Sequence, residues 1–248
     1  IKLKPPGWNE DLPGRIRAHG FEPFFYPYEA NWPEEVGDAV AFRFGYFDCF
    51  APAKLQYFLQ WQKRGATLLN PAMFILDSKV IMAALNLPLV REQIARNDPG
   101  ALPVLDGCIP ETLLLQENNV ARLATEKDAW LVKYAGFDGG NQAWGGRSLQ
   151  LGLNHSAESW RQALAQALEI PWPVVAQRLV PSAQIDIAYT DAHNETQMMR
   201  QGTTRLRTFF LRRDAETVAC GSHLTVSGGT IQVSEATDAV QAPVVFQD

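Results

Sequence analysis

Short apolar segments alternate with segments of helical spacing along most of this chain, and that alternation constrains the fold more than any single motif. Residues 39–47 (AVAFRFGYF) are rich in aromatic side chains and are typical of a strand. Residues 52–65 (PAKLQYFLQWQKRG) place Leu55, Phe58 and Leu59 on one helical face. The two segments together predict a first strand–helix step.

The same step recurs before the chain changes character. Residues 203–213, 216–227 and 241–247 are typical of antiparallel hairpins, with a turn signal at Asp214. Strand and helix alternation followed by a mainly antiparallel end predicts an α+β or α/β fold. Further strands are expected at 66–70, 111–115, 129–135 and 173–180, and further helices at 76–86, 119–128 and 156–170.

Two of the expected helices carry apolar side chains at spacings that favour burial. In the helix expected at 156–170, Ser156 is placed to cap the first turn. The side chains expected to be buried are Ile81, Ala84 and Leu85 in the first helix, and Trp160, Leu164, Ala167 and Leu168 in the second.

The composition excludes several classes of protein. The 248 residues are 46% hydrophobic and 20% charged, which indicates a folded globular protein. The formal net charge of -5 argues against a nucleic-acid surface, which needs clustered Lys and Arg. Cys49, Cys108 and Cys220 include no CxxC pair, so neither a disulfide framework nor a structural zinc site is indicated.

No apolar stretch approaches the length of a bilayer span, and no signal-like segment precedes residue 30. We therefore expect a cytoplasmic protein without membrane or nucleic-acid partners. The chain begins with Ile1, which leaves open whether a portion precedes it.

A glycine-rich stretch follows the strand expected at 129–135. Its two pairs, Gly139-Gly140 and Gly145-Gly146, allow a close backbone approach that residues with a Cβ resist. Consecutive N–H groups in such a loop can converge on phosphate oxygens. The stretch lacks the patterns GxxxxGK[ST] and GxGxxG, so a phosphate-binding loop and a surface turn remain alternatives.

Two lysines are candidates for binding an anion. Lys133 lies inside an apolar strand, where burial of its charge is costly without a negative partner such as phosphate. The alternative is an edge strand from which Lys133 points to solvent. Lys79 lies in an expected helix, where most lysines are solvated.

These features follow one another in a defined order between about residue 39 and residue 246. The order is Lys79 near a helix start, the step IPET into a strand, Lys133 with the glycine loop, a Trp-bearing helix, and the apolar strand PVVAQRLV. It resembles the ATP-grasp superfamily, most closely its glutathionylspermidine-synthase-like and circularly permuted branches.

The resemblance implies an ATP-grasp fold, in which two α+β lobes hold the nucleotide between them. Residues 76–248 would form this domain, with the glycine-rich loop at 137–147. Residues 1–75 would form part of a Rossmann-like pre-ATP-grasp region. ATP and Mg²⁺ are the implied cofactors.

The resemblance also implies a role for each candidate residue. Lys79 and Lys133 would contact the ATP phosphates. The loop that would fold over them contains Gly139, Gly140, Gly145 and Gly146. The segment beside adenine, which would use backbone groups, consists of Gln177, Arg178, Leu179 and Val180.

Two arginines complete the implied site. Arg205 and Arg207 resemble the basic strand position that holds the transferred phosphoryl group or an acyl phosphate in related enzymes. A guanidinium suits this role because it binds phosphate in a bidentate manner. Strand alternation puts both on one face together with Thr203. The alternative is a solvent-facing strand that is basic to discourage edge pairing.

The magnesium site departs from the family pattern. Related enzymes are expected to hold the metal with an acidic residue and a late Glu-x-Asn pair, and this pair is absent from the C-terminal part of the sequence. We assign no metal ligand. The available carboxylates are Asp186, Glu195, Glu216, Glu235 and Asp238.

The implied activity is that of an ATP-dependent carboxylate–amine ligase acting through an acyl phosphate on a small-molecule carboxylate and a small-molecule amine. One alternative is a degenerate nucleotide-binding protein without turnover, as the missing Glu-x-Asn suggests. Another is a noncatalytic domain that binds a protein through residues 21–32 (FEPFFYPYEANW).

Overall fold

The computed structural model divides the chain into two compact units, Ile1–Ala72 (unit 1) and Met73–Asp248 (unit 2). Each unit is described by itself. The residues that the structure describes are 12–27, 29–43, 50, 52–70, 74–136, 146–191, 193–213, 216–228 and 239–244.

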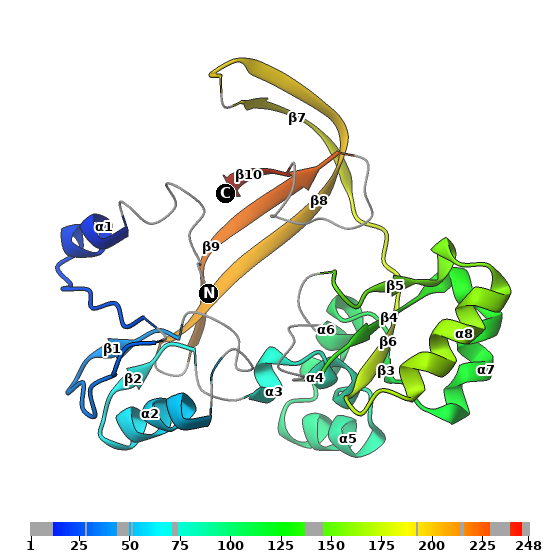
Figure 1. Cartoon of the computed structure of the whole chain (residues 1–248), viewed down its shortest axis with the longest axis horizontal. Helices are drawn as coiled ribbons and strands as arrows, with labels where there is room; N and C mark the ends of the chain where they lie inside the picture. Colours follow the sequence, from blue (N-terminus) through cyan, green and yellow to red (C-terminus); the bar gives the residue numbers. More distant parts are fainter. Residues whose placement is uncertain are drawn as a thin grey trace. The chain divides into compact units, whose positions relative to one another are not determined.

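Unit 1 packs around a cluster of aromatic side chains. The aromatic residues Trp32, Phe58 and Trp61 are buried in it together with Ala66. The rings of Trp32 and Trp61 stack at 5.7 Å. Its described elements are α1 (Leu12–Ala18), β1 (Val40–Ala41), α2 (Pro52–Lys63) and β2 (Thr67–Leu68), and β1 pairs with β2 in parallel (Figure 1).

The structure confirms the helix of the first predicted step and corrects its buried face. Phe58 is buried, but Leu59 is about half exposed and Trp61 takes the buried position instead. The reason is that Trp61 lies three residues after Phe58, so the helix turns this pair toward Trp32. The strand expected at 39–47 is also shorter, because β1 ends at Ala41; residues 44–49 lie outside the described part.

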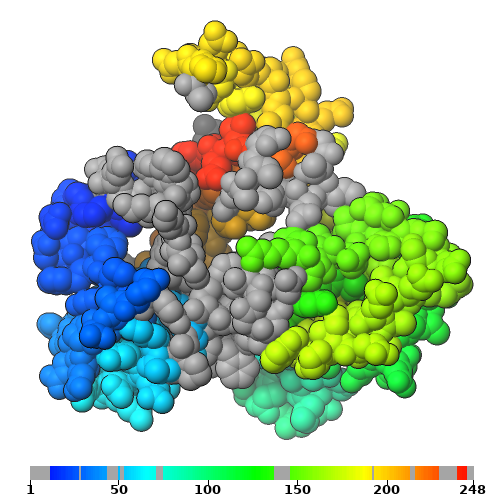
Figure 2. All heavy atoms as spheres, in the orientation of Figure 1, coloured from blue at the N-terminus to red at the C-terminus, as the bar shows by residue number. Residues whose placement is uncertain are grey.

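The first sheet of unit 2 is four-stranded and antiparallel, with helices on both faces. The strand order is β3-β6-β4-β5, with β3 at Thr112–Leu114, β4 at Trp130–Tyr134, β5 at Gln150–Leu151 and β6 at Val174–Arg178. Figure 1 shows helices α7 (Glu117–Thr125) and α8 (Ala157–Leu168) on one side of this sheet. In Figure 2 the sheet and these two helices form a continuous mass of green and yellow-green atoms.

The core between this sheet and α7 and α8 follows the predicted apolar spacing. Trp130, Trp160 and Leu164 are fully buried in it, and Trp160 Nε1 donates a hydrogen bond to the carbonyl oxygen of Leu123 at 2.9 Å. Ser156 Oγ accepts from the backbone N–H of Ser159, which confirms the predicted helix cap.

The helix expected at 76–86 is broken into two short helices, α3 (Phe74–Asp77) and α4 (Val80–Ala84). The break occurs at Ser78, whose side chain is buried and donates a hydrogen bond to the carbonyl oxygen of Ala135. This bond attaches the chain at Ser78 to the residue that follows β4. A continuous helix would not make this attachment. Ala83 is the buried residue of α4, whereas Ile81, Ala84 and Leu85, which were expected to be buried, are only partly so.

A pair of helices that sequence reasoning left unassigned follows α4. These are α5 (Pro88–Asn97) and α6 (Ala101–Cys108), and Arg91 forms a bidentate ion pair with Asp106 between them. The remaining short elements of this part are the 3₁₀ turns η2 (Lys127–Ala129) and η3 (Gly152–Asn154).

The C-terminal part of unit 2 forms a second four-stranded antiparallel sheet, with the order β10-β9-β8-β7. The predicted hairpins are therefore confirmed, and one further strand, β7, was not predicted. The strands are β7 (Gln184–Thr190), β8 (Thr196–Arg213), β9 (Glu216–Ser227) and β10 (Ala239–Val244).

Strand β8 bends along its length, as Figure 1 shows. The pairing with β7 shifts where Asp186 lies opposite both Arg200 and Gln201, which is a β-bulge. Gln201 has a positive φ of 48°, and its N–H donates to Asp186 Oδ1 at 2.8 Å. The Asp186 carboxylate therefore stabilises the bend.

Together these elements make a mixed α+β protein with several small sheets. Within the described ranges, none of the helices combines the length and the apolar character that crossing a bilayer requires.

Candidate functional site

The two lysines singled out in the sequence meet on one face of the β3-β6-β4-β5 sheet. Side chains alternate along β4, so Trp130 and Val132 enter the core beneath α7 and α8 while Lys133 faces the opposite side. β4 is an inner strand, paired with both β6 and β5. Lys133 is buried, with 8% of its surface exposed, so the alternative of a solvent-facing lysine on an edge strand is wrong.

Lys79 reaches this face because α4 packs on it. Val80 and Ala83 contact Ala135 and Val175, which are on the same side of the sheet as Lys133. Asn86 Nδ2 donates to the carbonyl oxygen of Thr112 in β3 at 3.0 Å.

The bond from Ser78 to Ala135 fixes the chain immediately before Lys79. Ser78 Oγ also accepts from Val80 N–H at 3.2 Å, so this one hydroxyl joins the start of α4 to the end of β4. The side chains of Lys79 and Lys133 come within hydrogen-bonding distance of each other as a result.

The electrostatics of this pair follow from burial and like charge. Burial lowers the pKa of Lys133, the charge of Lys79 lowers it further, and the result is a pKa of about 8. The pKa of Lys79 is also lowered by burial, while its hydrogen bond to Lys133 acts in the opposite direction. Above about pH 8, where Lys133 loses its proton, an ammonium of Lys79 can donate to the neutral amine of Lys133.

Such a pair is costly to keep fully charged unless an anion lies beside it. A buried lysine and a half-buried lysine that meet on a sheet face supply, when both are protonated, up to six N–H donors and no acceptor. The arrangement is suited to a ligand with several negatively charged oxygens, such as a phosphate chain.

The segment 177–180 lies on the neighbouring strand and beyond its end. Gln177 is opposite Leu131 in β4, and its amide group donates to Thr112 Oγ1 at 2.8 Å. The N–H of Arg178 donates to Glu111 and that of Leu179 to Ala129, so the sheet already uses these two donors. Val180 lies outside β6 and is 59% exposed, which makes it the exposed residue of the segment.

The side chain of Arg178 belongs to a structural network. Its guanidinium lies 5.0 Å from the ring centroid of Trp130 and pairs with Glu126 at 3.3 Å. Arg122 stacks on the same ring at 5.0 Å and binds Glu111 in a bidentate manner. This side chain therefore stabilises the ends of β4 and β6, and only the backbone at 178 belongs to the expected adenine segment.

Most of the glycine-rich loop lies outside the described residues. This applies to 137–145, which include Gly139, Gly140 and Gly145. Gly146 is described, and its carbonyl oxygen accepts from Leu149 N–H at 3.1 Å. Ser148 Oγ then accepts from Tyr134 N–H at 3.1 Å, so the chain after the loop is attached to the end of β4, one residue from Lys133.

Arg205 and Arg207 lie on β8 in the second sheet. Arg205 pairs in register with Thr225 and Arg207 with His223, and both arginines share one face with Thr203. Arg205 is half-buried, whereas Arg207 is exposed. The two expected positions thus differ in their access to solvent.

The described carboxylates do not assemble a metal site. No group of three or more His, Cys, Asp or Glu side chains converges within the described ranges. Asp186 binds Arg200 and the N–H of Gln201, and Glu235 and Asp238 lie outside the described part. Within the described part of the chain, the carboxylates therefore do not form a magnesium site of three or more protein ligands.

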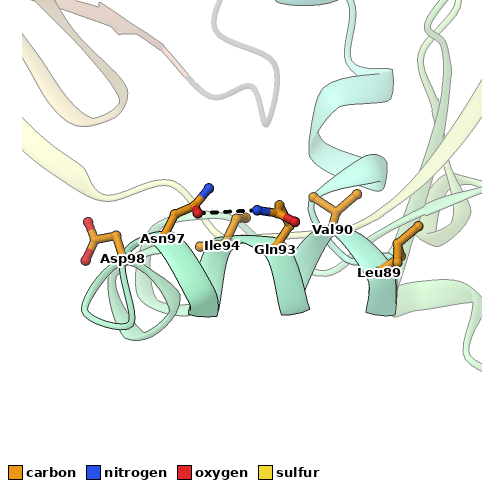
Figure 3. Close-up of a pocket in the computed structure, with 6 residues that line it drawn as sticks. All are labelled: Leu89, Val90, Gln93, Ile94, Asn97 and Asp98. Atoms are coloured by element: carbon orange, nitrogen blue, oxygen red, sulfur yellow. Dashed lines mark hydrogen bonds between the residues drawn. The ribbon is translucent and has the colours of Figure 1, made fainter.

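Two surface features are distinct from the lysine pair. Figure 3 shows a groove along α5, lined by Leu89, Val90, Gln93, Ile94, Asn97 and Asp98. In unit 1 the aromatic stretch expected to bind a partner exposes Phe21 (63%), Phe24 (73%) and Phe25 (58%), while Trp32 is buried in the core.

Sequence reasoning missed Ser78 and Asn86, which position Lys79. The available signal was weak, because a serine before a helix usually indicates a cap and gives no information about a partner on a distant strand. Searches of known protein families and of curated proteins found no match for this chain.

Proposed function

We propose that this protein is an ATP-dependent carboxylate–amine ligase with an ATP-grasp fold, in which residues 76–248 bind the nucleotide and residues 1–75 form a pre-ATP-grasp region. The observation that carries the proposal is the contact between Lys79 and Lys133 on one sheet face. Both side chains are largely removed from solvent, and a phosphate chain would compensate their charge.

The spacing on the sheet supports a nucleotide as the ligand. Lys133 is directly opposite Val175 on β6. From Val175 to Leu179, one residue beyond the end of β6, four residues of extended chain span about 13 Å. That length is comparable with the separation between the base and the terminal phosphates of ATP. A base beside Val180 and phosphates at the lysines would therefore follow the direction of β6.

The proposed reaction needs positioning more than covalent catalysis. A carboxylate oxygen attacks the γ-phosphorus, ADP leaves, and an acyl phosphate forms. The amine then attacks the acyl carbon and inorganic phosphate leaves. Lys79 and Lys133 hold the nucleotide phosphates, and Arg205 or Arg207 would hold the oxygens of the acyl group.

Magnesium would neutralise the phosphate oxygens in such a reaction. Because the described carboxylates do not gather around a metal position, we assign no step to a protein-bound ion.

Calorimetry with ATP tests the proposal directly. Lys79→Met and Lys133→Met should each weaken ATP binding by about ten- to a hundredfold, since each removes a charge-assisted hydrogen bond. Lys63→Met is the matched control, because Lys63 is an exposed lysine at the end of α2. Equal affinity in all four proteins, with unchanged circular dichroism, would overturn the phosphate role.

Turnover separates the ligase from a protein that binds nucleotide without using it. A ligase should form ADP in the presence of ATP, a carboxylate and an amine. ATP binding with no ADP formation across a broad set of such pairs would favour the degenerate binder.

An interaction role for unit 1 is supported by a separate observation. Phe21, Phe24 and Phe25 are each more than half exposed within five residues of chain. Exposed aromatic clusters of this kind are typical of protein-binding surfaces. Removing one of these rings in Phe24→Ala should leave ATP affinity unchanged under this second role.

A further inference from the structure

Strand β8 is longer than the strands beside it. Among the described residues, β7 pairs with β8 only as far as Thr203, and the N–H of Thr204 donates to the carbonyl oxygen of Ala183 at 2.9 Å. Residues 205–213 continue beyond this point and pair with β9 alone among the described strands. Figure 1 shows this part of the sheet as a two-stranded ribbon of β8 and β9 that extends beyond β7 and β10.

One side of this ribbon presents backbone groups in the order that a further strand would need. Backbone N–H and C=O groups point alternately to the two sides of a strand, and those of Thr204 point toward β7. The same side therefore receives the groups of alternate residues further along, which we call the open edge: Leu206, Thr208 and Phe210.

The open edge is regular although the ribbon contains a β-bulge. Phe209 is opposite Gly221 and Phe210 is opposite Ala219, so the extra residue, Cys220, is in β9. The backbone of β8 keeps its alternation past the bulge. A bulge within an edge strand usually hinders pairing with another strand, and the open edge lacks this protection.

Both faces of β8 expose apolar side chains here. Phe209 and Leu211 project to one face, and Leu206 and Phe210 project to the other, because side chains alternate along a strand. Their exposed fractions range from 47% for Leu211 to 61% for Phe210. A two-stranded ribbon is at best marginally stable in water, and exposed apolar side chains on such a ribbon are typical of a surface that another protein covers.

The charge of this stretch indicates what kind of strand would cover it. Residues 205–213 contain four arginines and no acidic residue, in a chain whose formal net charge is -5. Pairing with the same stretch of a second copy would bring like charges together, which is unfavourable. A segment rich in Asp and Glu is attracted instead.

The use of both faces favours a protein strand over a nucleic acid. Single-stranded nucleic acid stacks its bases on an aromatic surface and places its phosphates in a basic groove. A strand that adds to a sheet edge bonds through its backbone and sends alternate side chains to the two faces. Here each face combines a phenylalanine with an arginine: Phe209 with Arg207, and Phe210 with Arg212.

We propose that the open edge of β8 binds an extended acidic segment of a partner protein, which adds to the sheet as a further strand. Backbone hydrogen bonds at Leu206, Thr208 and Phe210 hold the segment, its apolar side chains cover the phenylalanines, and its carboxylates face the arginines. The site uses neither lysine of the candidate nucleotide site.

A short labelled peptide tests the proposal on the full chain. The probe is the fluorescein-labelled octapeptide Glu-Glu-Val-Val-Glu-Glu-Val-Val, which places both carboxylates and apolar side chains on each face of a strand. Fluorescence anisotropy should show binding that weakens as salt is added. The same peptide with Lys in place of Glu should not bind. Methylating every backbone nitrogen keeps the charges but removes the donors, and should weaken binding about tenfold or more.

Hydrogen exchange locates the bound peptide. With the acidic probe at saturation, the amides of Leu206, Thr208 and Phe210 should exchange more slowly, because each acquires an acceptor. Exchange in residues 130–136 of the first sheet should be unchanged.

A substitution at the open edge tests the role of the backbone. Leu206→Pro removes an N–H that points away from β9, so the pairing of β8 with β9 is retained. This variant should bind the acidic probe about tenfold more weakly. Leu206→Val keeps the N–H and should bind like the wild type. Circular dichroism checks that both variants are folded.

Charge reversal tests the arginines and remains decisive if the proline variant does not fold. Arg212→Glu should weaken binding of the acidic probe about tenfold and allow the lysine peptide to bind. Arg161→Glu is the matched control, because Arg161 is an exposed arginine on α8, away from the second sheet. It should change neither affinity.

Three results would overturn the proposal. The first is no binding of the acidic probe, or binding without protection of the open edge. The second is tighter binding of oligothymidylate than of the acidic probe, which would assign the surface to nucleic acid. The third is a dimer in sedimentation that Leu206→Pro abolishes, which would assign the edge to a second copy. None of these measurements uses ATP, so they are independent of the proposed ligase function.

Discussion

At the scale of single residues, the unusual feature of this protein is a lysine inside an antiparallel sheet. Lys133 is on an inner strand, is 8% exposed and lies beside a second lysine. Burial and the neighbouring charge both favour the neutral amine, so the folded state binds the Lys133 proton less tightly than the unfolded chain. An anion would reverse this preference. The residue therefore links stability, pH and ligand binding.

The first prediction concerns the pH dependence of stability. The pKa of Lys133 is about 8 in the folded protein, against 10.5 for an ordinary lysine. Between these values the unfolded chain binds more protons, so the contribution of Lys133 makes the free energy of unfolding rise with pH from about 8 to about 10.5. Below pH 8 both states are protonated and the contribution is constant.

Urea denaturation of wild type and Lys133→Met at several pH values between 7 and 10 measures this contribution as a difference. Lys133→Met should be the more stable protein at pH 7, and its advantage should shrink as the pH approaches 10. Taking the difference between the two proteins removes the pH dependence that comes from groups present in both. An advantage that grows with pH, or a variant that is less stable at pH 7, would show that the charge of Lys133 is compensated within the protein.

At the scale of secondary-structure elements, hydrogen bonds from a few short side chains and close backbone contacts decide where elements begin and meet. Ser78 ends α3 and holds the start of α4 against β4. Asp186 stabilises the bend of β8 through Gln201. Gly152 allows η3 to approach η2 closely, because a Cβ there would overlap the carbonyl oxygen of Lys127.

The second prediction compares two glycines. In Gly152→Ala the new methyl group meets backbone atoms that cannot rotate away, so we expect a loss of about 1–3 kcal/mol or more in the free energy of unfolding. Gly107→Ala is the control: Gly107 is in α6, and a Cβ there has no atom within 4 Å.

Gly107→Ala should gain about 0.5–1 kcal/mol, because alanine loses less backbone entropy than glycine when it enters a helix. Thermal and urea unfolding measure both values. Equal stability of the two variants would mean that η2 and η3 separate at little cost.

At the scale of the whole molecule, the candidate nucleotide site is in unit 2 and the aromatic core of Trp32 and Trp61 is in unit 1. Lys79 immediately precedes α4, Lys133 is in β4, and the segment 177–180 contains the last two residues of β6 and the two that follow, so all three lie in a single sheet-and-helix layer. Binding should therefore stabilise that layer first, by an amount that mass action sets at about 2.7 kcal/mol when ATP is at a hundred times its dissociation constant.

The third prediction follows from this location and uses hydrogen exchange read peptide by peptide. With saturating ATP, peptides that contain residues 79–86, 130–136 and 174–180 should exchange more slowly, because local opening of this layer is opposed by the ligand. Peptides that cover residues 52–68 should be unchanged. Lys133→Met under the same conditions should show no added protection. Protection confined to residues 52–68 would place the nucleotide elsewhere.

The sequence alone determined the elements whose pattern is local. Alternation along β4 determined that Lys133 faces away from Trp130, and the spacing of Trp160, Leu164 and Ala167 determined the buried face of α8. These features depend on neighbours within a few positions, so strand and helix periodicity are sufficient to predict them. The alternation of strands and helices likewise predicted a mixed α+β protein.

Only the tertiary structure decided what meets across long stretches of chain. The break at Ser78, the contact of Lys79 with Lys133 and the open edge of β8 have no local signature. Each depends on which surfaces pack together and in what register, and a one-residue slip in register would turn Lys133 to the opposite face. Burial then decides the chemistry, because the same lysine is an ordinary cation in water and a group with a pKa of about 8 inside this sheet.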